Sequence, residues 1–173
     1  TYVNSRGDIV LSAFNHKTRR VRHALLHARL QKDDHNSGGI LALADGRLMV
    51  FYSRHNDGGG LRYRVSTKPA DVSRWRPEQI VTGTNRSGAV TYSNPVLVGD
   101  NEKRIYVFFR SGAKDPHVSW SDDGGKNWSG PRQYVNNPAN PFPYVQATAG
   151  NDSRIHILWT DSHPRDPFKN RNV

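Results

Sequence analysis

Residues 47–53 read Arg-Leu-Met-Val-Phe-Tyr-Ser, and this stretch decides the fold. It is an unbroken run of β-forming residues that follows a turn and ends on polar groups, a pattern typical of a strand buried on both faces. The same pattern occurs three more times, which indicates an internal repeat. The other copies are residues 8–14, 104–110 and 154–160.

The spacing of these copies predicts the architecture. Their starts lie 39, 57 and 50 residues apart, which fits the roughly 40 to 50 residues of a four-stranded propeller blade. We therefore predict an all-β chain, a β-propeller of four-stranded antiparallel blades, forming one partial propeller domain over residues 1–173. The predicted blades are approximately 1–34, 35–82, 88–136 and 140–173, so about three and a half blades are present.

Strands are expected at particular places within these blades. The first blade offers three strands, at 1–4, 8–14 and 21–26, and the fourth holds two, beginning at Tyr144. The predicted strands of the second blade are 40–44, 47–54, 61–66 and 78–81, and those of the third are 95–98, 104–110, 117–121 and 132–135.

Composition excludes several classes of protein. Of the 173 residues only 35% are hydrophobic, while 15 Gly and 10 Pro punctuate the chain, which argues against a helical bundle. No apolar run approaches the ~20 residues of a membrane helix, and the chain as given shows no secretion signal, so we expect a soluble protein. With 0 Cys there is no disulfide and no thiolate. The net charge of +10 favours an anionic partner, either nucleic acid or acidic polysaccharide.

Residues 121–128, Ser-Asp-Asp-Gly-Gly-Lys-Asn-Trp, match the Asp-box pattern Ser-x-Asp-x-Gly-x-x-Trp. In such a turn the Asp accepts hydrogen bonds from nearby backbone N–H groups and the Trp packs into the blade. We predict a structural role for the four pattern residues. They are Ser121, Asp123, Gly125 and Trp128. A looser version runs from Ser66 to Trp75 in the second blade, with Asp71 between.

A propeller closes its ring to hide sheet edges, and three and a half blades leave that ring open. Two interpretations follow. The chain is part of a longer protein whose C-terminal half completes the ring, or two such halves self-associate. We favour the first.

Several motifs add a family resemblance. The segments are DDHNSGG at 33–39, ADGRLMVFYSRH at 44–55, YRVSTKP at 63–69, TYSNP at 91–95, FFR at 108–110 and WTDSHPR at 159–165. Together they resemble the BNR-repeat (Asp-box) propeller family that includes ulvan lyases and rhamnose–glucuronate polysaccharide lyases. The resemblance covers essentially the whole chain and implies the N-terminal half of a seven-bladed ring. It also implies a secreted or periplasmic protein that cleaves uronate-containing polysaccharide by β-elimination.

The resemblance implies four catalytic residues, namely His35, His55, Tyr92 and Arg110. The placement of the last two is less secure, because the loop at 82–90 varies in length. One departure from the family is visible. Relatives commonly have Pro soon after the His-Asn pair, whereas this chain has Ser37-Gly38-Gly39, which we expect to loosen the entry to the strand that follows His35.

The chemistry of elimination supports these residue types independently. The reaction needs a cation to neutralise the uronate carboxylate, a base for the C5 proton and an acid for the leaving O4. Histidine suits base or acid because its usual pKa lies near neutrality. Tyr92 would need a lowered pKa to act as a base, and we expect Arg110 both to hold the carboxylate and to favour the Tyr92 phenolate.

Propeller geometry predicts that these residues meet. His35 and Tyr92 precede the first strand of a blade, while His55 and Arg110 end the second strand, so all four should lie at one rim. The fourth blade offers substrate-binding candidates at corresponding positions. They are Tyr144, Asp161, His163 and Arg165.

Structural roles remain open for each candidate. His55 aligns with His16 of the first blade and is open to a role as a strand-capping residue of the repeat. His35 is open to a role as a turn residue held by Asp33 or Asp34, Tyr92 to one as a packed aromatic, and Arg110 to one in a structural ion pair. His163 and Arg165 are open to either role.

Other site types are weakly supported. His23 and His27 share a face but lack the Glu of a zinc protease, and Asp33, Asp34 and Asn36 do not follow an EF-hand spacing. We predict no metal and no cofactor, with structural calcium or zinc as a weak alternative. The basic residues at 17–22 and 169–171 belong to no nucleic-acid-binding motif, so neither nucleic acid nor a membrane is expected as partner. The Arg-Ile-Pro opening of sialidases is absent.

The leading hypothesis is thus a polysaccharide lyase-like protein whose partner is an acidic polysaccharide. The alternative is a non-catalytic module that binds acidic glycans, or a structural half-propeller that needs a partner to close the ring.

Overall fold

The computed structural model describes residues 1–36, 38–86, 88–99, 104–112, 115–136, 143–150 and 153–160. These residues form thirteen β-strands and two short 3-10 helices, and they contain no α-helix. The all-β prediction is confirmed. Across the described ranges, no helix has the length and apolar character needed to cross a membrane.

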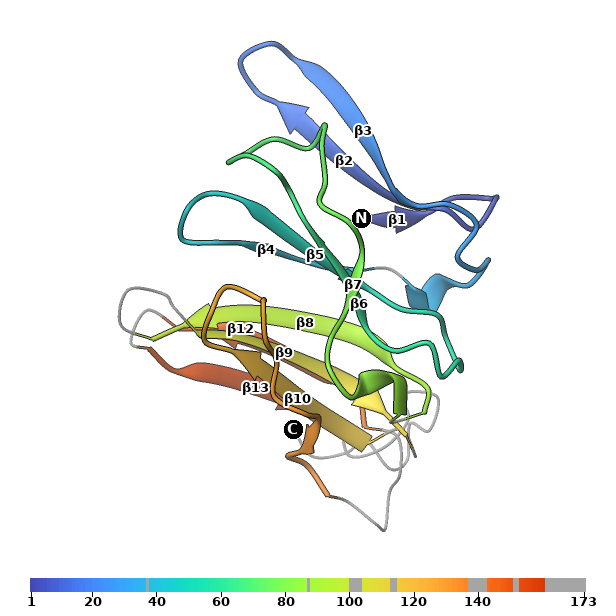
Figure 1. Ribbon diagram of the computed structural model, residues 1–173, viewed down its shortest axis with the longest axis vertical. Coiled ribbons are helices and arrows are strands. Elements are labelled where there is room, and N and C mark those ends of the chain that lie inside the picture. Colours follow the sequence, from blue (N-terminus) through green and yellow to red (C-terminus); the bar gives the residue numbers. More distant parts are fainter. Residues whose placement is uncertain are drawn as a thin grey trace.

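The strands form four antiparallel sheets that follow one another along the chain (Figure 1). The first sheet contains β1 (Tyr2–Val3), β2 (Ile9–Asn15) and β3 (Arg20–His27), and the second contains β4 (Gly39–Ala42), β5 (Leu48–Tyr52), β6 (Arg62–Val65) and β7 (Gln79–Ile80). The third contains β8 (Thr91–Val98), β9 (Arg104–Ser111), β10 (Asp115–Ser121) and β11 (Arg132–Gln133), and the fourth contains β12 (Val145–Ala149) and β13 (Ile155–Trp159). The 3-10 helices are η1 (Asp34–Asn36) and η2 (Thr84–Arg86).

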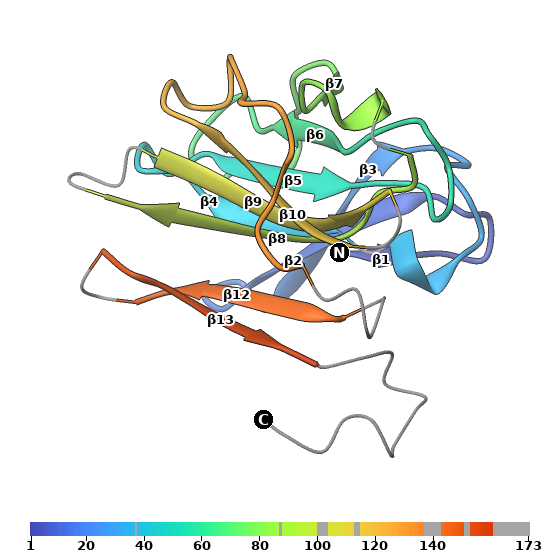
Figure 2. The same ribbon diagram turned by 90° about the horizontal axis from the view of Figure 1, so that it is seen from below.

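Within each sheet, strands that are consecutive in the sequence are neighbours, so every sheet is a simple meander. The four strands predicted in the second blade and the four in the third are confirmed to within a few residues. The first strands of the last three sheets, β4, β8 and β12, lie side by side in that order (Figure 2). This arrangement is consistent with part of a propeller.

Strand β5 shows what holds neighbouring sheets together. Its side chains alternate between its two faces, and residues 49–52 are at most 1% exposed. Met49 and Phe51 pack in a cluster with Val107 of β9, whereas Val50 and Tyr52 pack in a cluster with residues of β2 and β3. The apolar run therefore joins the second sheet to both neighbours, which explains why it has no polar alternation.

The predicted equivalence of residues 8–14 and 47–53 is wrong. β5 ends near His55, which contacts Gln31. β2 instead begins near Gln31, because the Gln31 N–H donates to the carbonyl of Gly7, just before β2. In Figure 1 the β2 arrow points away from η1. β2 therefore packs on β5 in the same way as β6, the third strand of its sheet, packs on β9. β2 thus takes the position of the third strand in a blade. An apolar run does not encode strand direction, so His16 lies at the opposite rim and is not equivalent to His55.

Two glycines allow close packing at the start of β4. A Cβ on Gly39 would lie 2.6 Å from the Ser93 carbonyl oxygen, and one on Gly38 would collide with the Phe51 carbonyl. The Gly39 N–H also donates to the Ser93 hydroxyl at 3.1 Å. The expectation that Gly38 and Gly39 loosen this entry is therefore wrong. Gly39 allows β4 to pack tightly against β8, and Gly38 allows the chain just before β4 to pass close to β5.

Candidate active site

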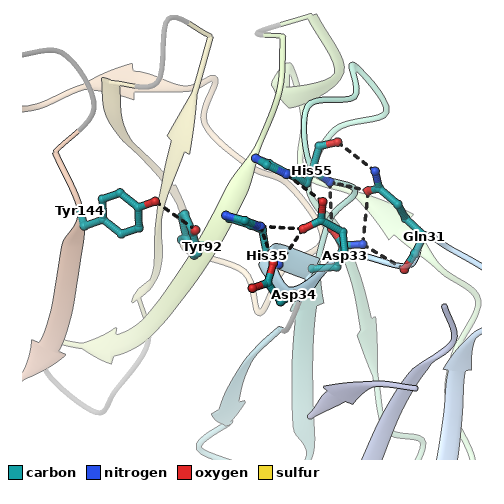
Figure 3. Close-up of polar contacts among 8 residues, drawn as sticks. Gln31, Asp33, Asp34, His35, His55, Tyr92 and Tyr144 are labelled. Carbon is teal, nitrogen blue, oxygen red and sulfur yellow. Dashed lines mark hydrogen bonds and ion pairs between the residues drawn. The ribbon is translucent and has the colours of Figure 1, made fainter. Parts of the chain in front are cut away.

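Two loops of the second sheet bring His35 and His55 together. His35 lies in η1, just before β4, and His55 follows β5. The backbone N–H of His55 donates to the side-chain oxygens of Asn36 and Gln31, both at 2.8 Å. Asn36 is fully buried and donates its amide to the Gln31 carbonyl at 3.2 Å. This network ties the loop after β5 to the segment before β4 (Figure 3).

The two imidazoles form a stacked pair held by one carboxylate. Their ring centroids are 3.9 Å apart and their planes differ by 12°. Asp33 Oδ1 lies 2.6 Å from His35 Nδ1, and Asp33 Oδ2 lies 2.9 Å from His55 Nδ1. Asp34 Oδ1 is also 2.8 Å from His35 Nδ1. We call Asp33, His35 and His55 the imidazole side of the site.

The charge of Asp33 follows from its surroundings. Burial alone would raise the pKa of its carboxyl group, but hydrogen bonds from the His35 backbone N–H and from both imidazoles hold that pKa at about 2. At neutral pH the carboxylate only accepts hydrogen bonds. Each Nδ1 must therefore carry a hydrogen, which leaves the Nε2 of a neutral ring with a free lone pair. In Figure 3 both outer ring nitrogens lie away from Asp33, on the side of Tyr92.

Three residues of the third and fourth sheets face this pair, and we call them the aromatic side. The Tyr92 ring is 5.4 Å from the His35 ring, and its hydroxyl donates to the Tyr144 hydroxyl at 3.3 Å. The Arg110 guanidinium lies over both phenol rings, 4.8 Å from that of Tyr92 and 5.0 Å from that of Tyr144. These residues line a shallow pocket together with Asn94, Phe109, Pro116, Pro143 and Val145.

Tyr92 has an unusual backbone. Its φ is +57°, and the register between β8 and β9 shifts between Thr91 and Asn94. A non-glycine residue in the left-handed region is strained and is commonly found at functional sites. The Asn94 side-chain amide donates to the Tyr92 carbonyl at 2.9 Å and stabilises the bulge.

The expected effect of Arg110 on Tyr92 is outweighed. Burial raises the pKa of the Tyr92 phenol, and the hydrogen bond with Tyr144 raises it further, whereas the positive charge of Arg110 opposes both. The prediction of a favoured phenolate is therefore wrong for this state of the protein. Tyr92 keeps its proton at neutral pH, so it is a proton donor.

The structure brings together five predicted site residues, namely His35, His55, Tyr92, Arg110 and Tyr144. Asp161, His163 and Arg165 lie outside the described residues. Sequence reasoning considered Asp33 as a residue that holds His35 in a turn and, with Asn36, as a weak candidate calcium ligand. It did not single out Gln31 or Asn36 as partners of His55. The spacing of Asp33 two residues before His35 is a signal for their contact, but nothing in the sequence indicates that the same carboxylate reaches His55.

The Asp-box turn lies away from this site and joins two sheets. Asp123 Oδ1 accepts hydrogen bonds from the backbone N–H groups of Lys126 and Asn127, both at 2.9 Å. The backbone and side chain of Asn127 hold the pKa of the Asp123 carboxyl at about 2. Trp128 contacts the rings of Phe51 and Tyr63 edge-on, at 5.7 and 5.6 Å.

The looser turn at 66–75 keeps only part of this arrangement. Trp75 donates its indole N–H to the carbonyl three residues before it, as Trp128 does. Asp71, however, accepts from the Ser73 N–H and makes no bond to Ser66.

The side chains of Asp33, His35 and His55 are close enough to be considered as metal ligands. Their geometry fits hydrogen bonding better, because both Nδ1 atoms already donate to Asp33 and the lone pairs of parallel stacked rings do not converge on one ion. The other pair considered, His23 and His27, has separate partners. His23 bonds to Ser12 and His27 to Glu78.

Comparisons with known proteins place this geometry in context. Two solved structures of a PL25 ulvan lyase share the fold. One, bound to a glucuronate–rhamnose-3-sulfate chain, matches with a TM-score of 0.71 and 22% identity, over 91% of this chain and 41% of that one. The other matches with a TM-score of 0.69 and the same identity and coverage. The chain thus spans about 41% of the length of these lyases.

No curated protein sequence matches the chain. A family model, described as "BNR repeat-containing family member", matches residues 1–173. The chain belongs to the BNR repeat-containing family.

Proposed function

We propose that this chain forms part of a seven-bladed propeller lyase that cleaves a uronate-containing polysaccharide, of the ulvan or rhamnose–glucuronate type, by β-elimination. The observation that carries the proposal is Arg110 packed against two phenol rings, beside a pair of imidazoles. Action on such a polymer also favours a secreted or periplasmic protein.

Arg110 has the properties of a carboxylate-binding residue. It is only 8% exposed, and it forms no ion pair with any residue in the described ranges. A buried cation without a counter-ion is costly, and a planar carboxylate satisfies a guanidinium through two parallel hydrogen bonds. A uronate carboxylate bound there would lie beside the imidazole pair.

The remaining groups divide the two proton transfers. An imidazole Nε2 accepts the C5 proton of the uronate, and the electrons of the C5–H bond form the C4–C5 double bond as the C4–O4 bond breaks. The Tyr92 phenol, which is protonated at neutral pH, gives its proton to the leaving O4. Arg110 stabilises the negative charge that develops on the carboxylate.

The open faces of the outer sheets support a ring that continues beyond them. β13 packs on the third sheet through Ile155 and Ile157, while Leu158 on its other face is 60% exposed. On the first sheet, Val21 and Leu25 are 53% and 55% exposed. Further sheets packed on these two faces would bury them, in the same way that the neighbouring sheets bury both faces of β5. Further blades of the same protein are our preferred source.

Ultraviolet absorbance tests the proposal directly, because elimination creates a conjugated double bond and hydrolysis does not. The protein is mixed with ulvan and with a rhamnose–glucuronate polymer, and absorbance is followed over time. We expect a rise that Arg110→Ala reduces at least about 10²-fold, as for loss of a group that stabilises transition-state charge. Arg104→Ala is the matched control, since Arg104 lies at the other end of β9 and pairs with Asp122. If the folded protein produces no rise in absorbance with either polymer, the lyase proposal is refuted.

The exposed apolar faces also favour the second candidate, a half-propeller that binds acidic glycans or needs a partner to close. Light scattering separates the two. A species of twice 19.5 kDa that binds the polymer without releasing unsaturated ends supports the second candidate.

A further inference from the structure

The imidazole pair depends on one residue that has no assigned role. Asp33 supplies a separate carboxylate oxygen to each ring, at 2.6 and 2.9 Å from the two Nδ1 atoms. The backbone N–H of His35 donates to the same Oδ1 at 2.9 Å, which fixes the carboxylate relative to η1. The Asp33 side chain is 23% exposed, so its bonds are partly shielded from water.

We infer that Asp33 is a positioning residue for the elimination, which holds both His35 and His55 in the tautomer that directs a free Nε2 lone pair toward the substrate. This inference rests on the proposed function. A ring whose Nδ1 carries the hydrogen presents Nε2 as a base, whereas the opposite tautomer presents an N–H there and cannot accept a proton. One carboxylate therefore controls the base form of both rings.

Stacking gives the carboxylate a second effect. At a centroid distance of 3.9 Å, a charge on one ring disfavours a charge on the other. Asp33 carries one negative charge, which balances a positive charge on one ring but not on both. The groups that face the pair are Asp33 and Asp34 on its own segment, Tyr92 from β8, and Arg110 and Tyr144 behind Tyr92. None of the others contacts both rings.

Asp34 provides the matched control. Its Oδ1 lies 2.8 Å from His35 Nδ1, but its side chain is 93% exposed and it makes no bond to His55. Asp34→Asn removes the same charge from the same segment without removing the bridge.

The experiment compares Asp33→Asn, Asp33→Glu and Asp34→Asn in the full protein with 15N-labelled histidine. In an amide one atom accepts and the other donates, so Asn in place of Asp33 must force one ring into the Nε2–H tautomer whichever way the amide lies. Two-bond 1H–15N correlations above neutral pH, assigned to His35 and His55, should show both rings as Nδ1–H in the wild type and in Asp34→Asn, and only one of the two in Asp33→Asn. In parallel, kcat should fall about 10- to 100-fold in Asp33→Asn, with KM within about twofold. Asp33→Glu should recover part of this loss.

The outcomes separate the two proposals. If both His35 and His55 are Nδ1–H rings in folded Asp33→Asn, or if kcat equals that of Asp34→Asn, the role of Asp33 is overturned. The expected tautomer change in a protein that eliminates no polymer supports the positioning of the rings and counts against the lyase. If Asp33→Asn does not fold, Asp33→Glu carries the test, because wild-type kcat in that variant overturns the need for this exact geometry.

Discussion

The imidazole side and the aromatic side of the site are held in different ways. The imidazole side comes from one sheet, and directional hydrogen bonds to Asp33, Asn36 and Gln31 fix its members. The aromatic side comes from two sheets, and ring contacts with one 3.3 Å hydroxyl bond hold it. On the imidazole side, both Nδ1 atoms have a partner within the protein. The aromatic side instead contains a cation, Arg110, that lacks a counter-ion among the described residues. Under the proposed function, the imidazole side is preorganised for proton transfer and the aromatic side is completed by the substrate.

The largest expected effect is on the imidazole side. His35→Ala and His55→Ala should each reduce kcat about 10³-fold, within the range known for loss of a positioned general base, while KM changes little. His16→Ala, at the exposed hairpin of the opposite rim, should have no effect. The elimination rate measured by ultraviolet absorbance checks this. A variant that retains most of the wild-type kcat would remove that histidine from the chemistry.

Tyr92→Phe asks whether the aromatic side also takes part in proton transfer. The ring contacts with His35 and Arg110 remain, but the hydroxyl is lost, so we expect kcat to fall about 10²-fold. Tyr106→Phe on β9 is the control. If the Tyr92 variant eliminates at the wild-type rate, the hydroxyl is only a partner of Tyr144 and the acid must be another group.

Arg110→Lys tests whether substrate completes the aromatic side. The charge remains, but the planar fork that binds a carboxylate through two bonds is lost. We expect KM to rise about tenfold, equivalent to about 1.4 kcal/mol, with a smaller change in kcat. Steady-state kinetics on one polymer at fixed ionic strength measure both. A change in kcat alone would indicate that Arg110 acts on the reacting atoms and not in binding.

The smallest effect is on stability in acid. The pKa of Asp33 is lowered from 3.8 to about 2 in the folded protein, so its contribution is present above pH ~4 and is lost as the pH falls toward 2. The difference in Tm between the wild type and Asp33→Asn should therefore shrink over that range. Asp123, whose pKa is also about 2, titrates in both proteins, so its contribution cancels in the difference in Tm. A difference that stays constant from pH 5 to 2 contradicts the charged bridge.

The sequence predicted the strands of the second and third sheets because residues buried on both faces leave a clear apolar run. It could not give their direction, and β2 was consequently matched to the wrong strand. β13 has the same apolar pattern as β5, yet Leu158 and Trp159 are 60% and 46% exposed, because burial depends on a neighbouring sheet and not on the strand itself.

The meeting of His35, His55, Tyr92 and Arg110 at one rim was predictable from the order of strands in a blade. The bulge that places Tyr92 at a φ of +57° was not, since it depends on the pairing of β8 with β9. The bridge from Asp33 to His55 spans 22 residues and likewise exists only after β4 and β5 have paired. Burial of Tyr92, which outweighs the charge of Arg110, is a property of the assembled sheets.

The close approach of Gly39 to Ser93 has a consequence for the curvature of the whole array. Because the imidazole side belongs to the second sheet and the aromatic side to the third and fourth, the angle between successive sheets sets the separation of the imidazoles from Tyr92. A side chain at position 39 would open that angle and part the two groups without touching either. The geometry of the site therefore depends on the spacing of the sheets. A ring with a different number of blades would need other residues to bridge the same sugar.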